Sequence, residues 1–425
     1  MLFKSIQYPE TVFSFHQSQV PILRFQISGS HQREYITVKI ASIIGAGADL
    51  IRCAPLSRLL RRENREVLIH TGQQYDQNLS RIFFDQLKVP VPDYHLGVAS
   101  EYHGEQTGLM LERVEEVLLE VNPQLALVYG DSDGALAGAL AAAKLSIPVV
   151  HVEAGLRSFN RRMPEEINRI LVDRLSSLLF CPTETAVVNL KREGIVEGVH
   201  NSGDVMYDAV LYNLQRAQEV SDILARLDLQ PGEYYLVVLH RASNADDPEN
   251  LHSILKALGQ LDLPVVFPVH PRTHKALKRL MQESQIELPF LRLVDPVSYV
   301  DMLLLEKKAK KILTDSGGVQ KEAYFLGVAC ITLRRETEWT ETLQGGWNTL
   351  AGSDAQAIGR AILLDPPRRS RPDVFGDGHA AEKMAALLDQ WPSLPPNHPS
   401  RQLAVGSRQA PPPRLPRRQG KNSKQ

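Results

Sequence analysis

The feature that most constrains the fold is a repeated alternation of short, continuously apolar segments with helical segments. The apolar segments are rich in β-branched residues and end in small or polar residues, as buried strands do. We predict strands at 38–44, 66–70, 125–129, 148–152, 234–239, 264–268 and 310–314. Helical periodicity lies between them, for example at 107–121 and 135–144. Apolar strands that alternate with helices predict an α/β fold with parallel sheets covered on both faces.

The chain has 425 residues, a length that fits two domains with flanking segments. The pattern restarts near residue 206, after a polar connector. We therefore predict two Rossmann-like domains, at 38–205 and 206–364, followed by a C-terminal segment at 365–392.

Both ends of the chain differ from this pattern. Residues 1–37 have no clear period and are predicted to be an N-terminal extension, either disordered or not native to the protein. Residues 393–425 are rich in Pro, Arg and Ser, contain no Asp or Glu, and predict a disordered basic tail.

The composition argues against several classes of protein. A formal net charge of −1 does not suggest a general nucleic-acid or membrane-surface binder. The three cysteines are far apart in the sequence, which argues against a disulfide framework or a zinc site and fits the cytoplasm. No apolar run reaches the roughly 18 residues that a membrane helix needs.

Polar residues follow five of the predicted strands. In open parallel sheets, ligands bind beyond the carboxyl ends of the strands. These positions therefore predict one ligand site that faces both domains. The residues are Asp131, Glu153, His240, His270 and the segment Asp315-Ser316-Gly317-Gly318.

The segment DSGG predicts an anion site at the start of a helix. Ser316 suits an N-cap, and the absence of side chains at Gly317 and Gly318 lets a ligand approach the backbone amides. Free amides and the helix dipole favour a phosphate there. Glu322, about one turn further on, is placed to accept hydrogen bonds from ribose hydroxyls. The alternative interpretation is a capped helix with a surface Glu.

The stretch HVEAGLRSFNRRMPEEINR, residues 151–169, predicts a helix that begins near residue 163, with Pro164 in its first turn. We expect an apolar stripe on this helix and, on another face, Glu165 beside Arg169. The stripe consists of Ile167, Ile170 and Leu171.

Three carboxylates are predicted to converge near this helix, namely Asp131, Glu153 and Glu165. Inverting a C–H centre requires a proton to be removed from one face and delivered to the other, which two acid/base groups can do. The alternative is that Glu165 and Arg169 form a surface ion pair without a catalytic role.

Two further motifs allow more than one interpretation. His240 and His270 each have an arginine nearby, which favours contact with an anion over core packing. No His, Cys or carboxylate spacing resembles a metal site.

The segment GAGADL, residues 45–50, resembles a dinucleotide fingerprint, but Leu50 stands at the third glycine position. A nicotinamide cofactor is therefore not expected.

These stretches together resemble the non-hydrolysing UDP-N-acetylglucosamine 2-epimerase family, over about residues 38–388. The most specific matches are HVEAGLRSFNRRMPEEINR and TDSGGVQKEA, the latter at 314–323. The resemblance implies a glycosyltransferase-B-like fold with the active site between the two domains. The C-terminal helix, near 379–390, would pack back on the first domain.

The resemblance also implies a reaction and a set of roles. UDP is eliminated across C1–C2 to give a 2-acetamidoglucal, and then adds back with protonation from the opposite face, without a redox cofactor. Family members are commonly homodimers. The implied catalytic residues are Asp131, Glu153, Glu165 and His240, and the implied substrate-binding residues are Arg52, Arg169, His270, Ser316, Gly317, Gly318, Glu322 and Arg334.

Departures from the family pattern leave alternatives open. The first loop usually carries an arginine where this chain has Gly47, and Arg52 replaces a lysine. Trp339 replaces an arginine of the simple branch, which favours the branch acting on UDP-2,3-diacetamido-2,3-dideoxyglucuronate. UDP-N-acetylglucosamine is the expected substrate because it is the commoner activity. The rival classes are a glycosyltransferase of this fold, a non-catalytic UDP-sugar-binding protein and a dehydrogenase.

Overall fold

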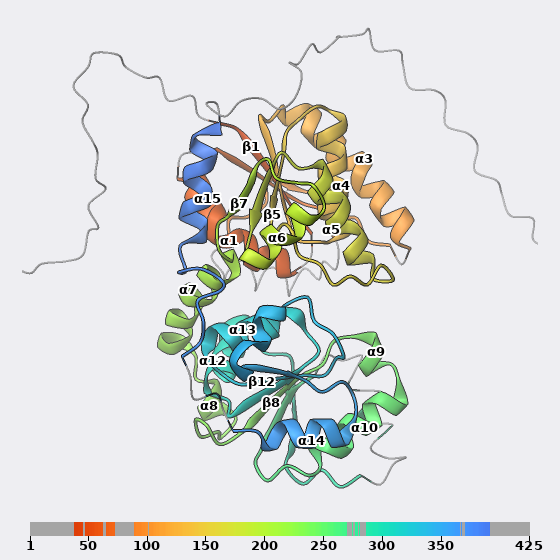
Figure 1. Ribbon diagram of the computed structural model, residues 1–425, viewed down its shortest axis with the longest axis vertical. Coiled ribbons are helices and arrows are strands. Elements are labelled where there is room, and N and C mark those ends of the chain that lie inside the picture. Colours follow the sequence, from red (N-terminus) through yellow and green to blue (C-terminus); the bar gives the residue numbers. More distant parts are fainter. Residues whose placement is uncertain are drawn as a thin grey trace, which may run out of the picture. The chain divides into compact units, whose positions relative to one another are not determined.

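The computed structural model describes residues 38–391, except for 46, 63–64, 73–88, 101, most of 270–285, 366 and 368–369. Its first half is built on a parallel sheet with strand order β3-β2-β1-β4-β5-β6-β7 (Figure 1). The strands are β1 (Ile40–Ile44), β2 (Glu66–His70), β3 (Tyr94–His95), β4 (Leu125–Tyr129), β5 (Val149–Val152), β6 (Leu178–Cys181) and β7 (Val199–Asn201).

The second half repeats this arrangement in a parallel sheet with order β10-β9-β8-β11-β12-β13. The strands are β8 (Tyr235–Val238), β9 (Val265–Pro268), β10 (Leu291–Val294), β11 (Lys311–Thr314), β12 (Cys330–Thr332) and β13 (Asn348–Leu350). In both sheets the strand order reverses beside the first strand, between β1 and β4 and between β8 and β11. Such switch points are where open α/β sheets bind ligands.

Helices accompany both sheets (Figure 1). In the first half they are α1 (Gly47–Arg61), α3 (His103–Val121), α4 (Asp133–Lys144), α5 (Pro164–Leu175) and α6 (Glu184–Arg192). In the second half they include α8 (Ile223–Arg226), α9 (Ala242–Ala245), α10 (Pro248–Leu258), α12 (Tyr299–Lys308), α13 (Gly317–Leu326), the 3-10 helix η1 (Thr340–Gly346) and α14 (Ala355–Leu363).

All seven predicted strands form, with ends that differ by no more than two residues from those expected. The strands that the sequence did not predict are short or lie toward the edges of the sheets. β3 has two residues, and β7, β12 and β13 have three each, too few to show a period. The α/β fold with two parallel sheets is confirmed.

Two helices connect the halves. Residue 206, where the pattern restarts, lies inside α7 (Val205–Val220) rather than at a strand. The C-terminal helix α15 (Ala380–Asp389) packs against α1 and α7. Asp208 of α7 accepts hydrogen bonds from the first backbone amides of α15, Ala380 at 3.1 Å and Ala381 at 2.8 Å.

The expected apolar stripe of α5 is wrong. Ile167 and Leu171 are 47% and 44% exposed. The buried side of this helix is instead mainly polar and comprises Glu166, Asn168, Arg169, Val172 and Asp173. Hydrophobicity placed the wrong face inward because buried polar side chains of α5 form hydrogen bonds with the backbone of nearby loops, whose polar groups need partners.

Candidate active site

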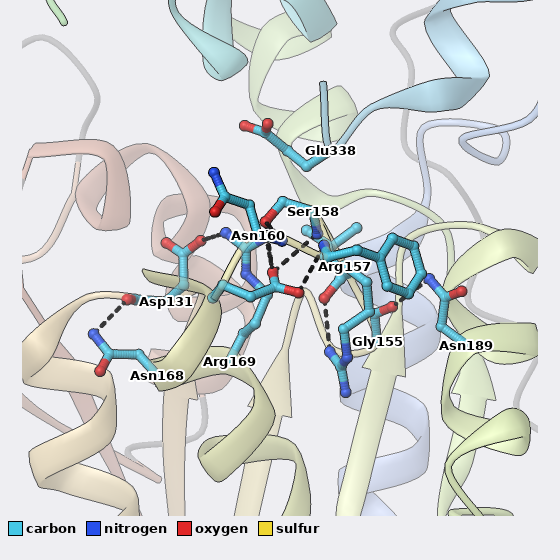
Figure 2. A network of polar contacts seen from close by, with 12 residues as sticks. Asp131, Gly155, Arg157, Ser158, Asn160, Asn168, Arg169, Asn189 and Glu338 are labelled. Carbon is cyan, nitrogen blue, oxygen red and sulfur yellow. Dashed lines mark hydrogen bonds and ion pairs between the residues drawn. The ribbon is translucent and has the colours of Figure 1, made fainter. Parts of the chain in front are cut away.

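The polar face of α5 holds the loop between β5 and α5 in place (Figure 2). The buried Glu166 carboxylate accepts hydrogen bonds from the backbone amides of Ser158 and Phe159, both at 2.9 Å, and from the Ser158 hydroxyl. Asp173, 1% exposed, accepts hydrogen bonds from Arg157 at 2.7 Å and from the amide of Gly155. These carboxylates therefore organise the loop.

Arg169 connects this scaffold to the loop after β4. Its guanidinium is buried, forms an ion pair with Asp131, and lies 3.1 Å from Glu166 (Figure 2). The alternative of a surface ion pair between Arg169 and Glu165 is wrong, because Arg169 is buried and pairs with Asp131 and Glu166. The Asn168 amide donates a hydrogen bond to the Asp131 carbonyl at 3.0 Å. Helix α5 thus fixes both the backbone and the side chain of Asp131.

Glu153 follows β5 in an unusual conformation. Its φ is +75°, a left-handed value that costs free energy in a residue other than glycine and often marks a functional position. Its carboxylate lies 2.7 Å from Nε of Arg52 and 2.5 Å from Nζ of Lys321. Burial by itself raises the pKa of Glu153, but Arg52 and Lys321 outweigh burial and hold that pKa below its usual value. Glu153 is therefore a carboxylate anion between two cations.

Lys321 extends this network. Its ammonium also lies 2.8 Å from Asp204 and 3.9 Å from the centre of the Trp339 ring. Lys321 is 1% exposed, so its charge depends on these partners. The contacts from Arg52 through Glu153 and Lys321 to Asp204 join α1 and α13 in one largely buried network.

The side chain of Asp49 occupies the loop after β1, within the segment GAGADL. The buried Asp49 carboxylate accepts hydrogen bonds from the Gly45 amide at 2.9 Å, from the Ser132 hydroxyl at 3.1 Å and from Arg52 at 2.9 Å. The Asp49 carboxylate thus occupies this loop, bonded to the Gly45 amide, and a second anion beside it is disfavoured. This contact argues against the dinucleotide interpretation of GAGADL.

The N-terminus of α13 lies directly after β11, at the switch point of the second sheet. Ser316 takes the N-cap position, but its side chain makes no capping hydrogen bond, contrary to expectation. A Cβ atom on Gly317 would lie 2.4 Å from Oε1 of Glu338, so only glycine allows this approach. Burial by itself raises the pKa of Glu338, but Arg334, 2.9 Å away, and Arg241 outweigh burial and hold that pKa below its usual value. Glu338 is therefore ionised.

Substituting the two glycines gives a matched test of this close approach. We expect Gly317→Ala to displace Glu338 from Arg334 and to lower stability by about 1–3 kcal/mol, as overpacking does. At Gly318 the nearest atom to a Cβ is the Met206 methyl at 3.6 Å, an ordinary contact. Gly318→Ala should therefore be neutral or stabilising, by up to about 1 kcal/mol. Thermal unfolding of both variants measures the difference, and equal shifts would contradict the tight contact at Gly317.

These elements enclose a cavity of about 200 Å³. Its volume is below the roughly 300 Å³ at which ligand pockets usually begin, so it fits part of a nucleotide sugar. Four cations and four carboxylates line it. The lining residues are Arg52, Asp131, Glu153, Leu156, Met163, Glu165, Arg169, Arg241, Gly317, Gly318, Lys321, Glu338 and Trp339.

The structure brings together most, but not all, of the residues predicted from the sequence. The cavity contains Asp131, Glu153, Glu165, Arg52, Arg169, Gly317 and Gly318. Arg334 instead lines a neighbouring cavity of about 300 Å³. His240 has an exposed side chain and, like Ser316 and Glu322, does not line the first cavity. His270 lies outside the described residues.

Six cavity residues were not among those predicted from the sequence, although each lies within or beside a motif that the sequence singled out. Leu156 and Met163 belong to the stretch 151–169. Arg241 follows His240, and it is Arg241 that lines the cavity. Lys321 stands between Gly318 and Glu322 in α13. Glu338 and Trp339 end the segment LRRETEW, residues 333–339, in which Trp339 departs from the family pattern. Sequence position identified the right segments but not which side chain in each points into the cavity.

No helix in the described part of the chain is long and apolar enough to cross a membrane. Within residues 38–391, apart from the gaps given above, no group of His, Cys, Asp and Glu side chains is arranged to hold a metal ion.

Comparisons with known proteins agree on one family. Residues 58–389 match the family described as UDP-N-acetylglucosamine 2-epimerase. A Methanococcus maripaludis protein named UDP-N-acetylglucosamine 2-epimerase homolog is 49% identical, over 83% of this chain and 99% of its own length. A Pseudomonas aeruginosa relative, UDP-2,3-diacetamido-2,3-dideoxy-D-glucuronate 2-epimerase, is 43% identical over 83% of this chain and 99% of its own.

Solved structures show the same relationship. The Methanocaldococcus jannaschii UDP-GlcNAc 2-epimerase, in complex with UDP-GlcNAc and UDP, is 42% identical and superposes with a TM-score of 0.76. The match covers 82% of this chain and 99% of that structure. The match over residues 58–389, the relatives and the superposition together show that this chain belongs to the UDP-N-acetylglucosamine 2-epimerase family.

Proposed function

We propose that the protein interconverts UDP-N-acetylglucosamine and UDP-N-acetylmannosamine, as a step in making precursors of cell-surface polysaccharides. The observation that carries this proposal is the convergence of Asp131, Glu153 and Glu165 in one cavity with the start of α13. Carboxylates can move a proton at a carbon centre, and a helix N-terminus can hold a diphosphate. The cavity therefore combines acid/base groups with an anion site.

The reaction that this arrangement supports is elimination followed by re-addition. A carboxylate removes the C2 proton while the C1–O bond breaks and UDP departs with the electron pair, which leaves a C1–C2 double bond. UDP then re-forms the C1–O bond, and an acid delivers a proton to C2 from the opposite face. Asp131, Glu165 and Glu153 are the proposed proton-transfer groups, with His240 beside the phosphates. The protons and electrons balance without a hydride acceptor, so we propose no redox cofactor.

The proposed substrate contacts follow the same geometry. The diphosphate would bind the backbone of Ser316, Gly317 and Gly318, and Glu322 would bind the ribose. Positive charge for the diphosphate and the sugar would come from the arginines at and beside the cavity. Those proposed are Arg52, Arg169, Arg241 and Arg334, with His270 as a further contact.

A second candidate substrate is UDP-2,3-diacetamido-2,3-dideoxyglucuronate, on which the Pseudomonas relative acts by name. A uronate adds a carboxylate, which needs a cation. Arg241, which lines both cavities, is placed to supply one.

Proton NMR in heavy water, without added cofactor or acceptor, tests the proposal. With UDP-N-acetylglucosamine we expect deuterium at C2 and the appearance of the manno epimer. Exchange seen only with the diacetamido uronate would assign the second substrate. Binding without exchange of either sugar would contradict epimerisation and favour a transferase or a binding protein.

We further propose a homodimer in the cytoplasm. The exposed apolar residues Ile167 and Leu171 on α5 supply a surface for association. All three cysteines are buried free thiols, which fits a reducing compartment such as the cytoplasm. A dimeric mass by sedimentation that Leu171→Asp converts to a monomer supports this interface; a monomeric wild type contradicts the dimer. Cell fractionation tests the location.

A further inference from the structure

The proposed ribose-binding residue Glu322 lies beside a second buried acid, Glu306, which has no role in the function proposed above. Helix α12 carries Tyr299 and Glu306, which are seven residues apart and therefore lie on one face of the helix. Helix α12 packs against α13, where Glu322 lies. The Tyr299 hydroxyl donates a hydrogen bond to Oε1 of Glu322 at 2.7 Å.

Glu306 is 0% exposed, and in the described part of the chain neither of its carboxylate oxygens has a hydrogen-bond donor. A buried carboxylate without a donor is costly, whereas a neutral carboxylic acid brings its own donor. The group in hydrogen-bond contact with Glu306 is the Glu322 carboxyl. If Glu306 is protonated, its hydroxyl can donate a hydrogen bond to Glu322. This protonation supplies the missing donor and removes the repulsion between two like charges.

The neighbouring groups decide which carboxyl carries the proton. Burial raises the pKa of Glu322 above its usual value, but the hydrogen bond from Tyr299 and the charge of Lys321 oppose burial and favour the anion. Glu306 has no such partner. Burial, and then the charge of Glu322, raise the pKa of Glu306 well above its usual value. Glu322 is therefore the anion and Glu306 the neutral acid.

We propose that Glu306 is a positioning residue for nucleotide recognition: as a neutral acid it holds, together with Tyr299, the Glu322 carboxylate in the orientation that receives the ribose hydroxyls. This inference rests on the proposed UDP site. Glu322 has little freedom of its own, because donors on both sides fix its carboxylate plane. A fixed acceptor distinguishes a ribose from a deoxyribose, since a hydroxyl that is missing leaves the anion unpaired.

The test compares two variants and two ligands by calorimetry. Glu306→Gln keeps a donor toward Glu322, and Glu306→Leu removes it with little change in volume. We expect the wild type and Glu306→Gln to bind UDP about tenfold or more tightly than 2′-deoxyuridine diphosphate, as a hydrogen bond to a charged group would give. Glu306→Leu should lose most of this preference by weakening UDP binding alone. Circular dichroism of each variant checks that it is folded.

Three results would overturn the proposal. A Leu variant that weakens both ligands by the same factor would make Glu306 merely structural. A Gln variant that behaves like the Leu variant would exclude the donor role. A wild type that binds both nucleotides equally would show that Glu322 does not read the ribose. Failure of the proposed function looks different, because the wild type would then exchange no deuterium at C2 of either sugar, whichever nucleotide it prefers.

Discussion

Replacing Asp131 with Asn is expected to lower the rate of epimerisation by about 10²–10⁴-fold, the contribution of a positioned acid/base group. The amide cannot take up the C2 proton. It retains an oxygen that can accept a hydrogen bond from Arg169, so the buried guanidinium keeps a partner. UDP binds at α13 in our proposal, and its affinity should survive. Turnover by NMR and UDP binding by calorimetry measure the two effects.

The same variant also tests whether two groups act on opposite faces of C2. Without Asp131 one face loses its proton-transfer group, while Glu165 and Glu153 remain in the cavity. We therefore expect one epimer to exchange its C2 proton for deuterium without inverting, and the other not to exchange. Glu165→Gln is the matched comparison, because it removes another cavity carboxylate. Near-normal inversion by Asp131→Asn would remove Asp131 from the proton-transfer step.

The sequence predicted the segments of the site because strand ends in parallel sheets must meet at one edge. Asp131 and Glu153 follow neighbouring strands, and the register that pairs Tyr129 with Val152 brings their loops together. The glycines after β11 follow from the same rule. This reasoning needs only strand order and the direction of the chain, which short apolar segments reveal.

What the sequence could not predict is which side chains pair across long separations. Lys321 and Glu153 are 168 positions apart, and no local pattern indicates that they meet. At the end of β8 the expected histidine gives way to Arg241, because the direction of the chain after the strand decides which side chain enters the cavity. The buried face of helix α5 was predicted wrongly for a related reason. Its polar residues serve distant loops, and hydrophobic periodicity does not record such contacts.

Substituting Lys321 with Met is expected to have the largest effect on stability. The change removes the cation between Glu153 and Asp204 and leaves two buried carboxylates close together. Breaking a buried ion pair costs about 3–5 kcal/mol. Met fills a similar volume and can still contact the Trp339 ring, so lost packing is a small part of the change. Denaturant unfolding measures the loss.

The effect of pH on this variant identifies its cause. Burial already raises the pKa of Asp204, and the charge of Glu153 raises it as well, while Lys321 opposes both. Without Lys321, the folded-state pKa of Asp204 should rise further above its unfolded value, while Arg52 still pairs with Glu153. Stability from such groups is present below the unfolded pKa and is lost as pH rises through the folded pKa. The deficit of Lys321→Met should therefore be smaller at about pH 5 than at about pH 8.

A surface lysine provides the control. Lys383 lies 2.9 Å from Asp377, with side chains that are 45% and 60% exposed, so Lys383→Met should change stability far less than Lys321→Met does. If Lys321→Met matched this control, the buried network would contribute no more than a solvated pair. If its deficit grew toward acid pH, the uncompensated carboxylates would not be the cause. The expected pattern, a large deficit that shrinks as pH falls, follows from two buried anions that have lost their shared cation.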